Sequence, residues 1–342
     1  MRRVKLGQIC EVVSGGTPKT NVEEYWNGEF NWITPAEIND NDYIISDTKR
    51  KITQLAIEKK KLPLLPKGTV LLSSRAPIGK VAITGKEMYC NQGFKNLICS
   101  DEICNEYLYW YLKSKKEYLN SLGRGATFKE ISKKIVENIE IKLPEIERQR
   151  KIVDKLKKVD KIIQRRKNQS RLLDVVVQAR FVEMFGDPII NNMSWPESTI
   201  GDGCFVTKLA GFEYSKYIEY DDTGDVVMVK AQNVKNGTLN RKDLSFISNE
   251  VSDALPRSQL LPGDVVMTYV GANIGDVALI DDKYKYHLAP NVAKIRVDAK
   301  IYNSVYFMYM LMFLNSYIVK NSADTAKAAL GMERIETVSS FV

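Results

Sequence analysis

Short runs of β-branched and aliphatic residues recur in two distant parts of the chain. In the first half they occupy residues 70–72 and 81–83, and in the second half residues 265–267 and 277–279. In both halves a glycine-containing turn separates the two runs, a pattern typical of adjacent β-strands. Each half therefore predicts at least one pair of neighbouring strands.

These runs belong to an internal repeat. Residues 65–83 align without gaps with residues 261–279, a shift of 196 positions, and residues 32–38 meet residues 228–234 at the same shift. The opening segments meet at a shift of 194, with Leu6, Gly7 and Cys10 opposite Ile200, Gly201 and Cys204. Residues 103–112 meet residues 301–310 at 198. Small changes of shift are expected from loop insertions between matching elements.

Aromatic and methionine-rich stretches at residues 107–112 and 305–314 follow the strand pairs, and we interpret them as core helices rather than as stacking surfaces. With strands and helices in each repeat, the fold class is predicted to be α/β (mixed α+β), with two related globular domains of roughly 140 residues each, within the usual domain size.

A long helix is predicted between the repeats. Pro144 and Glu145 suit a helix start, and Gly186 followed by Pro188 suits its end. About 40 residues at 1.5 Å each give a rod of about 60 Å. Apolar residues recur along it at steps of four and three, as in a coiled-coil seam. The predicted seam residues are Ile152, Leu156, Val159, Ile163, Leu173, Val177, Phe181 and Met184. The predicted organisation is therefore domain 1 at 1–143, helix at 144–186 and domain 2 at 187–342.

Charge is spread unevenly along the chain. The net charge is +8, with an excess of six positive charges in residues 1–144, six in 145–185, and an excess of four negative charges in 186–342. A polyanion would be attracted to the first half and the middle, although ordinary solubilising charge explains the same count. The longest apolar run, residues 305–319, is interrupted and shorter than the roughly 20 residues of a membrane span, so a cytoplasmic protein is expected.

Few residues are suited to metal binding or catalysis. Five cysteines without a paired spacing and a single histidine, His287, predict no metal site. The pair Gly79-Lys80 lacks the following Ser or Thr of a phosphate loop, and no Asn/Asp-Pro-Pro-aromatic motif for amino-methylation occurs. No catalytic residue is predicted.

Several blocks together resemble a known family. They are Lys5-Leu-Gly, Ser14-Gly-Gly-Thr-Pro18, Trp32-Ile-Thr, the 68–83 block, Leu143-Pro144 before the helix, Phe185-Gly-Asp-Pro188 and Trp195-Pro196. Their order over the chain resembles the specificity subunit of type I restriction-modification systems.

The resemblance implies a non-catalytic subunit in which two target-recognition domains each read one half of a bipartite DNA target. The helix would set their spacing and recruit methyltransferase subunits. Restriction/translocase subunits would join for cleavage, and S-adenosylmethionine, ATP and Mg²⁺ would act on those partners, with no cofactor in this chain. The family pattern closes with a second helix antiparallel to the first, before which this sequence stops.

That departure predicts self-association, or binding of a second helical fragment, through the central helix. It also leaves open an alternative function, a truncated or decoy scaffold that binds methyltransferase subunits without productive DNA reading. An enzyme is the third possibility.

Base reading requires Arg, Lys, Asn or Gln side chains on loops, and phosphate contacts position the protein. Domain 1 offers these DNA-binding candidates: Thr17, Lys19, Thr20, Arg75, Lys80, Asn91, Gln92, Arg124 and Lys129. Domain 2 offers these: Lys208, Tyr214, Lys216, Lys230, Gln232, Asn233, Tyr269, Asn273, Asn291 and Lys327.

Overall fold

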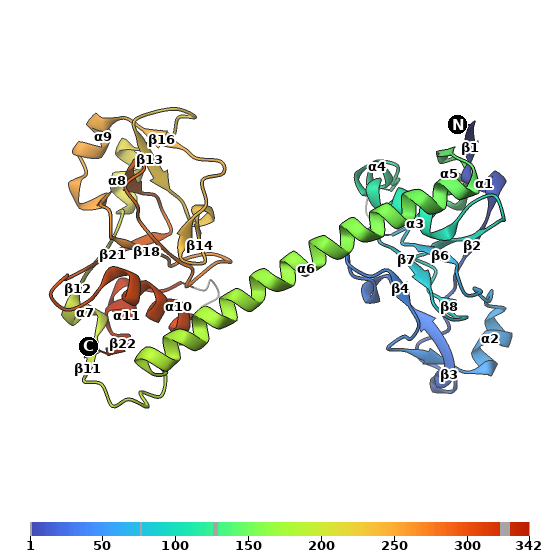
Figure 1. Cartoon of the computed structure of the whole chain (residues 1–342), viewed down its shortest axis with the longest axis horizontal. Coiled ribbons are helices and arrows are strands. Elements are labelled where there is room, and N and C mark those ends of the chain that lie inside the picture. The colour runs from blue at the N-terminus through green and yellow to red at the C-terminus, as the bar shows by residue number, and fades with distance from the viewer. Residues whose placement is uncertain (1, 76, 126–128, 322–328, 342) are drawn as a thin grey trace. The chain divides into compact units, whose positions relative to one another are not determined.

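The computed structural model describes residues 2–75, 77–125, 129–321 and 329–341. The chain divides into two compact units, unit 1 (Met1–Asn168) and unit 2 (Gln169–Val342). Both combine helices with β-sheets, which confirms the predicted mixed α/β class (Figure 1). The boundary between the units falls inside the long helix α6 (Ile146–Phe185), so each unit includes part of that helix.

Unit 1 contains these elements before α6: β1 (Arg2–Lys5), α1 (Leu6–Ile9), β2 (Cys10–Ser14), η1 (Glu23–Tyr25), β3 (Trp26–Ile33), η2 (Pro35–Glu37), β4 (Ile44–Ile45), β5 (Lys51–Ile52), α2 (Gln54–Lys60), β6 (Val70–Leu72), β7 (Val81–Thr84), β8 (Tyr89–Cys90), β9 (Lys95–Cys99), α3 (Asn105–Ser114), α4 (Lys116–Ser121), α5 (Lys133–Glu137) and β10 (Glu140–Leu143). A five-stranded sheet has the order β2-β9-β6-β7-β4, a three-stranded sheet the order β5-β3-β8, and β1 pairs with β10.

Unit 2 contains these elements after α6: β11 (Glu197–Thr199), α7 (Ile200–Gly203), β12 (Cys204–Lys208), α8 (Gly211–Tyr217), β13 (Val226–Val229), η3 (Ala231–Asn233), β14 (Val234–Lys235), β15 (Thr238–Leu239), β16 (Phe246–Ile247), α9 (Asn249–Asp253), η4 (Pro256–Ser258), β17 (Gln259–Leu260), β18 (Val265–Thr268), β19 (Val277–Leu279), β20 (Lys285–Leu288), β21 (Val292–Val297), α10 (Ser304–Asn321), α11 (Met332–Glu336) and β22 (Ser339–Phe341). Its sheets have the orders β12-β21-β18-β19, β16-β13-β20-β17, β11-β22 and β14-β15.

The repeat is visible in the strand pairing. The antiparallel pairs β2·β9, β6·β9 and β6·β7 of unit 1 recur in unit 2 as β12·β21, β18·β21 and β18·β19. The parallel pair β3·β8 recurs as β13·β20. The repeated sequence blocks therefore fold into the same local framework.

The structure corrects the gap-free alignment of the two hairpins. Val70 pairs with Ile83 in unit 1, whereas Val265 pairs with Leu279 in unit 2. The first strands therefore correspond at a shift of 195 and the second strands at 196, so the connecting turn of unit 2 is one residue longer. Because both strands are buried and apolar, their composition alone does not reveal a one-residue offset.

The predicted core helices are confirmed. Leu108 and Leu112 of α3 are fully buried against the five-stranded sheet, and Phe307 and Leu311 of α10 are fully buried in the corresponding core of unit 2. Each helix packs on one face of a sheet, and the apolar surface that its aliphatic and aromatic side chains remove from water stabilises the unit.

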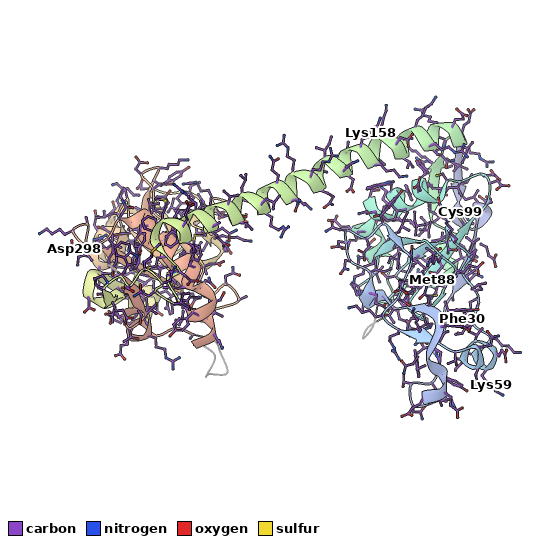
Figure 2. The ribbon with its side chains drawn as sticks, turned by 60° about the horizontal axis from the view of Figure 1, so that its bottom comes forward. Phe30, Lys59, Met88, Cys99, Lys158 and Asp298 are labelled. Atoms are coloured by element: carbon purple, nitrogen blue, oxygen red, sulfur yellow. The ribbon has the colours of Figure 1, made fainter. Side chains whose placement is uncertain are left out.

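Helix α6 runs without a break over 40 residues. It ends at Gly186, whose φ of +82° is the left-handed conformation of a helix terminator. Val153 near its start and Phe181 near its end are buried, whereas the seam residues Ile163 and Leu173 between them are 45% and 59% exposed. Figure 2 shows side chains projecting from this middle stretch. The coiled-coil partner stays a prediction. Across the described part of the chain, no helix is long and apolar enough to cross a membrane.

Candidate nucleic-acid interface

In unit 1 the loop after β2 is joined to the loop after β8. The Gly16 N–H donates to the Cys90 carbonyl at 2.9 Å, and Asn91 Nδ2 donates to Thr17 Oγ1 at 2.9 Å. Asn91 Oδ1 also accepts from the Gly93 N–H at 2.6 Å. Both ends of this amide are therefore bonded within the protein, which indicates that Asn91 shapes the loop.

Two tryptophans of β3 fix the same loop from its other side. Trp32 Nε1 donates to the Gly16 carbonyl at 3.0 Å, and Trp26 Nε1 donates to the Lys19 carbonyl at 3.2 Å. The side chains of Lys19 and Thr20 are left exposed. A loop whose backbone is held in place presents such side chains without a large ordering cost on binding.

Glu130 connects a second group of candidates. Arg75 Nε donates to one of its carboxylate oxygens at 2.9 Å, and the buried Lys95 Nζ lies 3.1 Å from the other. Burial alone would raise the pKa of Glu130, but its hydrogen bonds to Lys95 and Arg75 outweigh burial and lower the pKa. The backbones of Arg124 and Glu130 exchange two hydrogen bonds of 3.0 and 2.9 Å.

The two groups are adjacent in unit 1. The Ser74 N–H, next to Arg75, donates to the Gly93 carbonyl at 2.7 Å, which joins the loop after β6 to the loop after β8. Lys80 Nζ donates to the Pro35 carbonyl at 3.1 Å, and Gln92 and Lys129 are exposed. Loops far apart in sequence thus place the candidates of unit 1 in one neighbourhood.

Unit 2 builds the corresponding neighbourhood with other side chains. Lys208 Nζ, at the end of β12, lies 5.2 Å from the centroid of the Tyr269 ring, which follows β18. The Tyr269 N–H donates to the Asn291 carbonyl at 3.0 Å, and Asn291, after β20, has a φ of +71° and is exposed. Strand ends equivalent to those of unit 1 therefore carry Lys208, Tyr269 and Asn291.

The remaining candidates of unit 2 lie on α8 and on the loops after β13 and β18. Lys230 Nζ donates to Ser245 Oγ at 2.9 Å, and the Tyr214 and Tyr220 rings lie 6.0 Å apart. Lys216 lies over the Tyr217 ring, Gln232 Nε2 donates to the Asp243 carbonyl, and Asn273 is exposed. Lys327 falls outside the described residues.

Asn233 requires a correction. Its side chain is 2% exposed, its Nδ2 donates to the Asn240 and Lys242 carbonyls at 2.9 and 3.2 Å, and its Oδ1 accepts from the Lys230 N–H at 3.1 Å. A buried amide with these bonds holds the turn together and does not face a ligand. Sequence alone did not separate it from the exposed Asn273.

Two exposed residues were absent from the sequence candidates. Phe212 on α8 is 72% exposed, and Arg50, just before β5, lies over the Trp26 ring. The sequence around these two residues does not indicate a role in binding. Phe212 is an apolar residue in a short helix, which predicts burial, and Arg50 is a basic residue in a polar run, which predicts only exposure to solvent.

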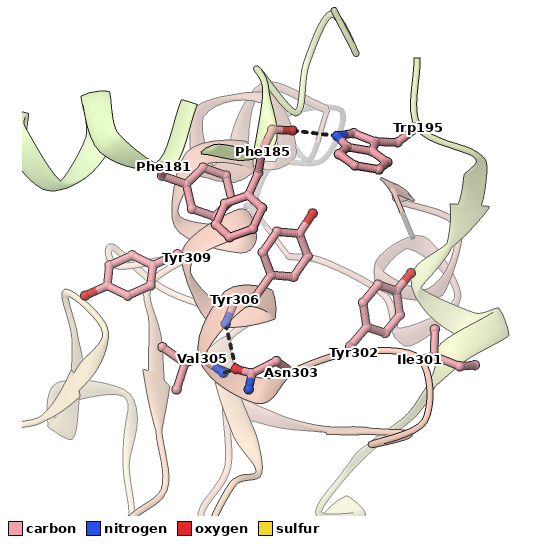
Figure 3. A pocket seen from close by; sticks show the side chains of 9 residues that line it. All are labelled: Phe181, Phe185, Trp195, Ile301, Tyr302, Asn303, Val305, Tyr306 and Tyr309. Carbon is pink, nitrogen blue, oxygen red and sulfur yellow. Dashed lines mark hydrogen bonds between the residues drawn. The ribbon is translucent and has the colours of Figure 1, made fainter. Parts of the chain in front are cut away.

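Unit 2 also contains an apolar cavity of about 480 Å³ (Figure 3). Phe181 stacks on Tyr306 with ring centroids 5.6 Å apart, and Trp195 Nε1 donates to the Phe185 carbonyl at 2.8 Å. The lining residues are Phe181, Phe185, Trp195, Ile301, Tyr302, Asn303, Val305, Tyr306 and Tyr309. With no acid, base or thiol in this lining, the cavity suits an apolar side chain rather than chemistry.

The described residues offer little else for catalysis. They contain no group of three His, Cys, Asp or Glu able to hold a metal ion. His287 is fully buried, and burial lowers its pKa. Burial also raises the pKa of Cys90 to about 12, so its thiol stays protonated near neutral pH.

Comparisons with known proteins agree with this arrangement. The family profile of the type I restriction modification DNA specificity domain matches residues 1–170. The type I restriction enzyme MjaIX specificity subunit of Methanocaldococcus jannaschii is 41% identical over 186 residues, which are 54% of this chain and 43% of that subunit. The MjaVIII specificity subunit of the same organism is 24% identical over 323 residues, 90% of this chain and 74% of that subunit. The chain thus spans less than half of the first relative and about three quarters of the second.

Solved structures show the same fold. The S subunit of a type I restriction-modification system from M. genitalium aligns over 99% of this chain and 83% of its own, with a TM-score of 0.55 and 14% identity. A chain from a study of complex assembly and conformational transition of the type I R-M system aligns over 99% and 84%, with a TM-score of 0.56 and 18% identity. With the repeated units, the long helix and the sequence matches in agreement, this chain belongs to the family of type I restriction-modification specificity subunits.

Proposed function

We propose that this chain reads a bipartite DNA sequence, with one half-site contacted by each unit. The observation that carries the proposal is the shared frame of the two units: the ends of equivalent strands and the loops after them carry Lys19, Arg75 and Gln92 in unit 1 and Lys208, Tyr269 and Asn291 in unit 2. Equal frames with different side chains suit the reading of two different half-sites, because base edges are distinguished by side-chain donors and acceptors.

In this proposal residues 1–143 and 187–342 are the two target-recognition domains. Residues 144–186 form a spacer that docks methyltransferase subunits, and restriction/translocase subunits join the complex. The chain itself is non-catalytic. Supporting observations are that His287 is fully buried and that burial raises the pKa of Cys90, so neither side chain suits acid–base or nucleophilic chemistry at the surface.

The test is to express the chain with its methyltransferase subunits and to sequence the methylated adenines. A single split motif is expected. Purified chain is then titrated into a fluorescent duplex carrying that motif, and affinity is expected to fall steeply as salt rises, because phosphate contacts release counterions. Chain alone with S-adenosylmethionine and the duplex should give no methylation. Turnover by the chain alone would overturn the non-catalytic assignment.

A decoy scaffold is the alternative; the excess of four negative charges in residues 186–342 agrees with it, but the similarity to specificity subunits favours DNA reading. The decoy function predicts that methyltransferase subunits bind while affinity for the duplex stays weak and independent of sequence. The duplex titration separates the two functions.

A partner helix for α6 is part of the same proposal, and the repeat supports it. In unit 1 the start of α6 is bonded to the segment just before α3: Gln149 Oε1 accepts from the Cys104 N–H at 2.8 Å, and Gln149 Nε2 donates to the Glu102 carbonyl at 2.9 Å. Helix α3 begins at Asn105 and α10 at Ser304, so the helices correspond at a shift of 199 and not at the 198 expected from the sequence. The equivalents of Cys104 and Glu102 in unit 2 are therefore Asn303 and Ile301, and both line the apolar cavity. A separate helical fragment resembling the start of α6 would fit there, because in a second copy that segment is already bonded to its own unit 1.

A further inference from the structure

The β3–β5 region of unit 1 holds an arginine that the sequence did not single out. Arg50 is exposed, and its guanidinium carbon lies 3.8 Å from the centroid of the Trp26 ring and 5.2 Å from that of Trp32. The two indoles themselves meet edge to face, with centroids 5.2 Å apart. Phe30 of the same strand and Lys59 of α2 mark this end of unit 1 in Figure 2.

The backbone of Arg50 is fixed. Its carbonyl accepts from the Trp32 N–H at 3.2 Å and from Thr48 Oγ1 at 2.7 Å. The following residues, Lys51 and Ile52, pair with β3. Both the main chain and the face of the guanidinium are therefore held, so little side-chain freedom remains to be lost on binding.

The charge of Arg50 is not matched by a carboxylate. None of the ion pairs among the described residues includes Arg50, although Arg75 in the same unit is paired with Glu130. A guanidinium stacked on a ring keeps its N–H donors at its edge, where their planar fork matches a phosphate. Stacking thus pre-orients a cation toward an anionic partner.

The same indole also holds the loop after β2, because Trp26 Nε1 donates to the Lys19 carbonyl. We propose that Arg50, stacked on Trp26, contacts a DNA phosphate, and that Trp26 thereby couples this backbone contact to the position of the loop carrying Lys19 and Thr20. The inference rests on the proposed function and deepens it. It assigns a phosphate contact to Arg50 and a positioning role to Trp26.

The experiment compares Arg50→Gln with Arg3→Gln in the full chain. Both remove an exposed arginine from unit 1, but Arg3 lies on β1, in a different sheet from β3 and β5. Binding to a fluorescein-labelled duplex with the wild-type methylated motif, and to a scrambled duplex, is measured between about 50 and 200 mM NaCl.

Arg50→Gln is expected to weaken binding to both duplexes by the same factor, on the order of tenfold, and to reduce the slope of log affinity against log salt by about 0.9. Arg3→Gln is expected to leave the slope unchanged. Trp26→Phe keeps an aromatic face for Arg50 but loses the indole N–H. It should largely keep the salt slope and lose discrimination at the half-site read by unit 1, with the other half-site unaffected.

An unchanged slope in Arg50→Gln, while the wild type binds DNA, would overturn the inference and leave the proposed function intact. A wild-type chain with no salt-dependent binding would overturn both. Equal losses at both half-sites in Trp26→Phe would remove the positioning role of Trp26.

Discussion

Arg75 donates through Nε to a carboxylate oxygen of Glu130 at 2.9 Å. The contact joins the loop after β6 to the segment before α5, and the other oxygen of the carboxylate takes the ammonium of Lys95. The Lys95 side chain is only 9% exposed, so Glu130 neutralises a buried cation as well as holding a candidate DNA contact. The Glu130 carboxylate therefore contributes both to the stability of unit 1 and to the position of Arg75 in the candidate nucleic-acid interface.

Glu130→Gln is expected to destabilise the chain by about 1–3 kcal/mol, because a buried charged group loses its partner. Urea denaturation measures the change, and Glu117→Gln, on an exposed position of α4, is the control. Since the folded-state pKa of Glu130 lies below its ordinary value of 4.5, its contribution is complete above pH 4.5 and is lost as pH falls through the lowered pKa. The free energies of unfolding of the wild type and of Glu130→Gln should therefore become equal in strong acid. A difference that stays constant as the pH falls would contradict the stabilising role of the Glu130 carboxylate.

Gly15→Ala is expected to disturb the loop after β2, and Gly16→Ala much less. A Cβ at Gly15 would overlap the Cys90 side chain and the carbonyl oxygens of Cys90 and Asn91, which cannot move without breaking the loop. A Cβ at Gly16 meets only Leu62 Cδ2, at 2.7 Å, and a side-chain end can shift. We expect a loss of about 1–3 kcal/mol for Gly15→Ala by thermal unfolding. Equal melting temperatures for the two variants would show that the backbone approach is looser than the structure indicates.

Asn233→Ala and Asn273→Ala separate a structural amide from a candidate reader. The first removes three hydrogen bonds of a buried side chain and is expected to cost about 1–3 kcal/mol. The second alters an exposed side chain and is expected to change stability by less than about 0.5 kcal/mol. Chemical denaturation gives both values. Loss of affinity for the methylated motif in a fully stable Asn273→Ala would support its role in base reading, whereas unchanged affinity would remove it from the candidates.

Leu173→Glu is expected to abolish association through α6, and Val175→Glu is the matched control. Both replace an exposed apolar residue, 59% and 49% exposed, but Val175 lies off the predicted seam. A charge in the seam opposes packing of a partner helix, whereas a charge on the other face stays hydrated. Light scattering of the concentrated chain measures the effect. A wild-type chain that remains monomeric at high concentration would count against self-association.

The sequence by itself determined the repeat, the two strand–helix frameworks and the long helix, because periodicity and helix-end residues are local signals that the fold rarely overrides. Its DNA-binding candidates stay predictions. It did not determine their roles: Asn233 and Asn273 look alike in sequence, and so do Arg50 and Arg75.

Only the tertiary structure decided which amide is buried, which arginine is paired with Glu130 and which is stacked on Trp26. The two arginine contacts join segments tens of residues apart, whereas Asn233 is bonded within its own turn and owes its burial to the packing around that turn. It likewise decided the one-residue difference between the two hairpin turns, since strand register is set by pairing across the sheet and not by the residues of either strand alone.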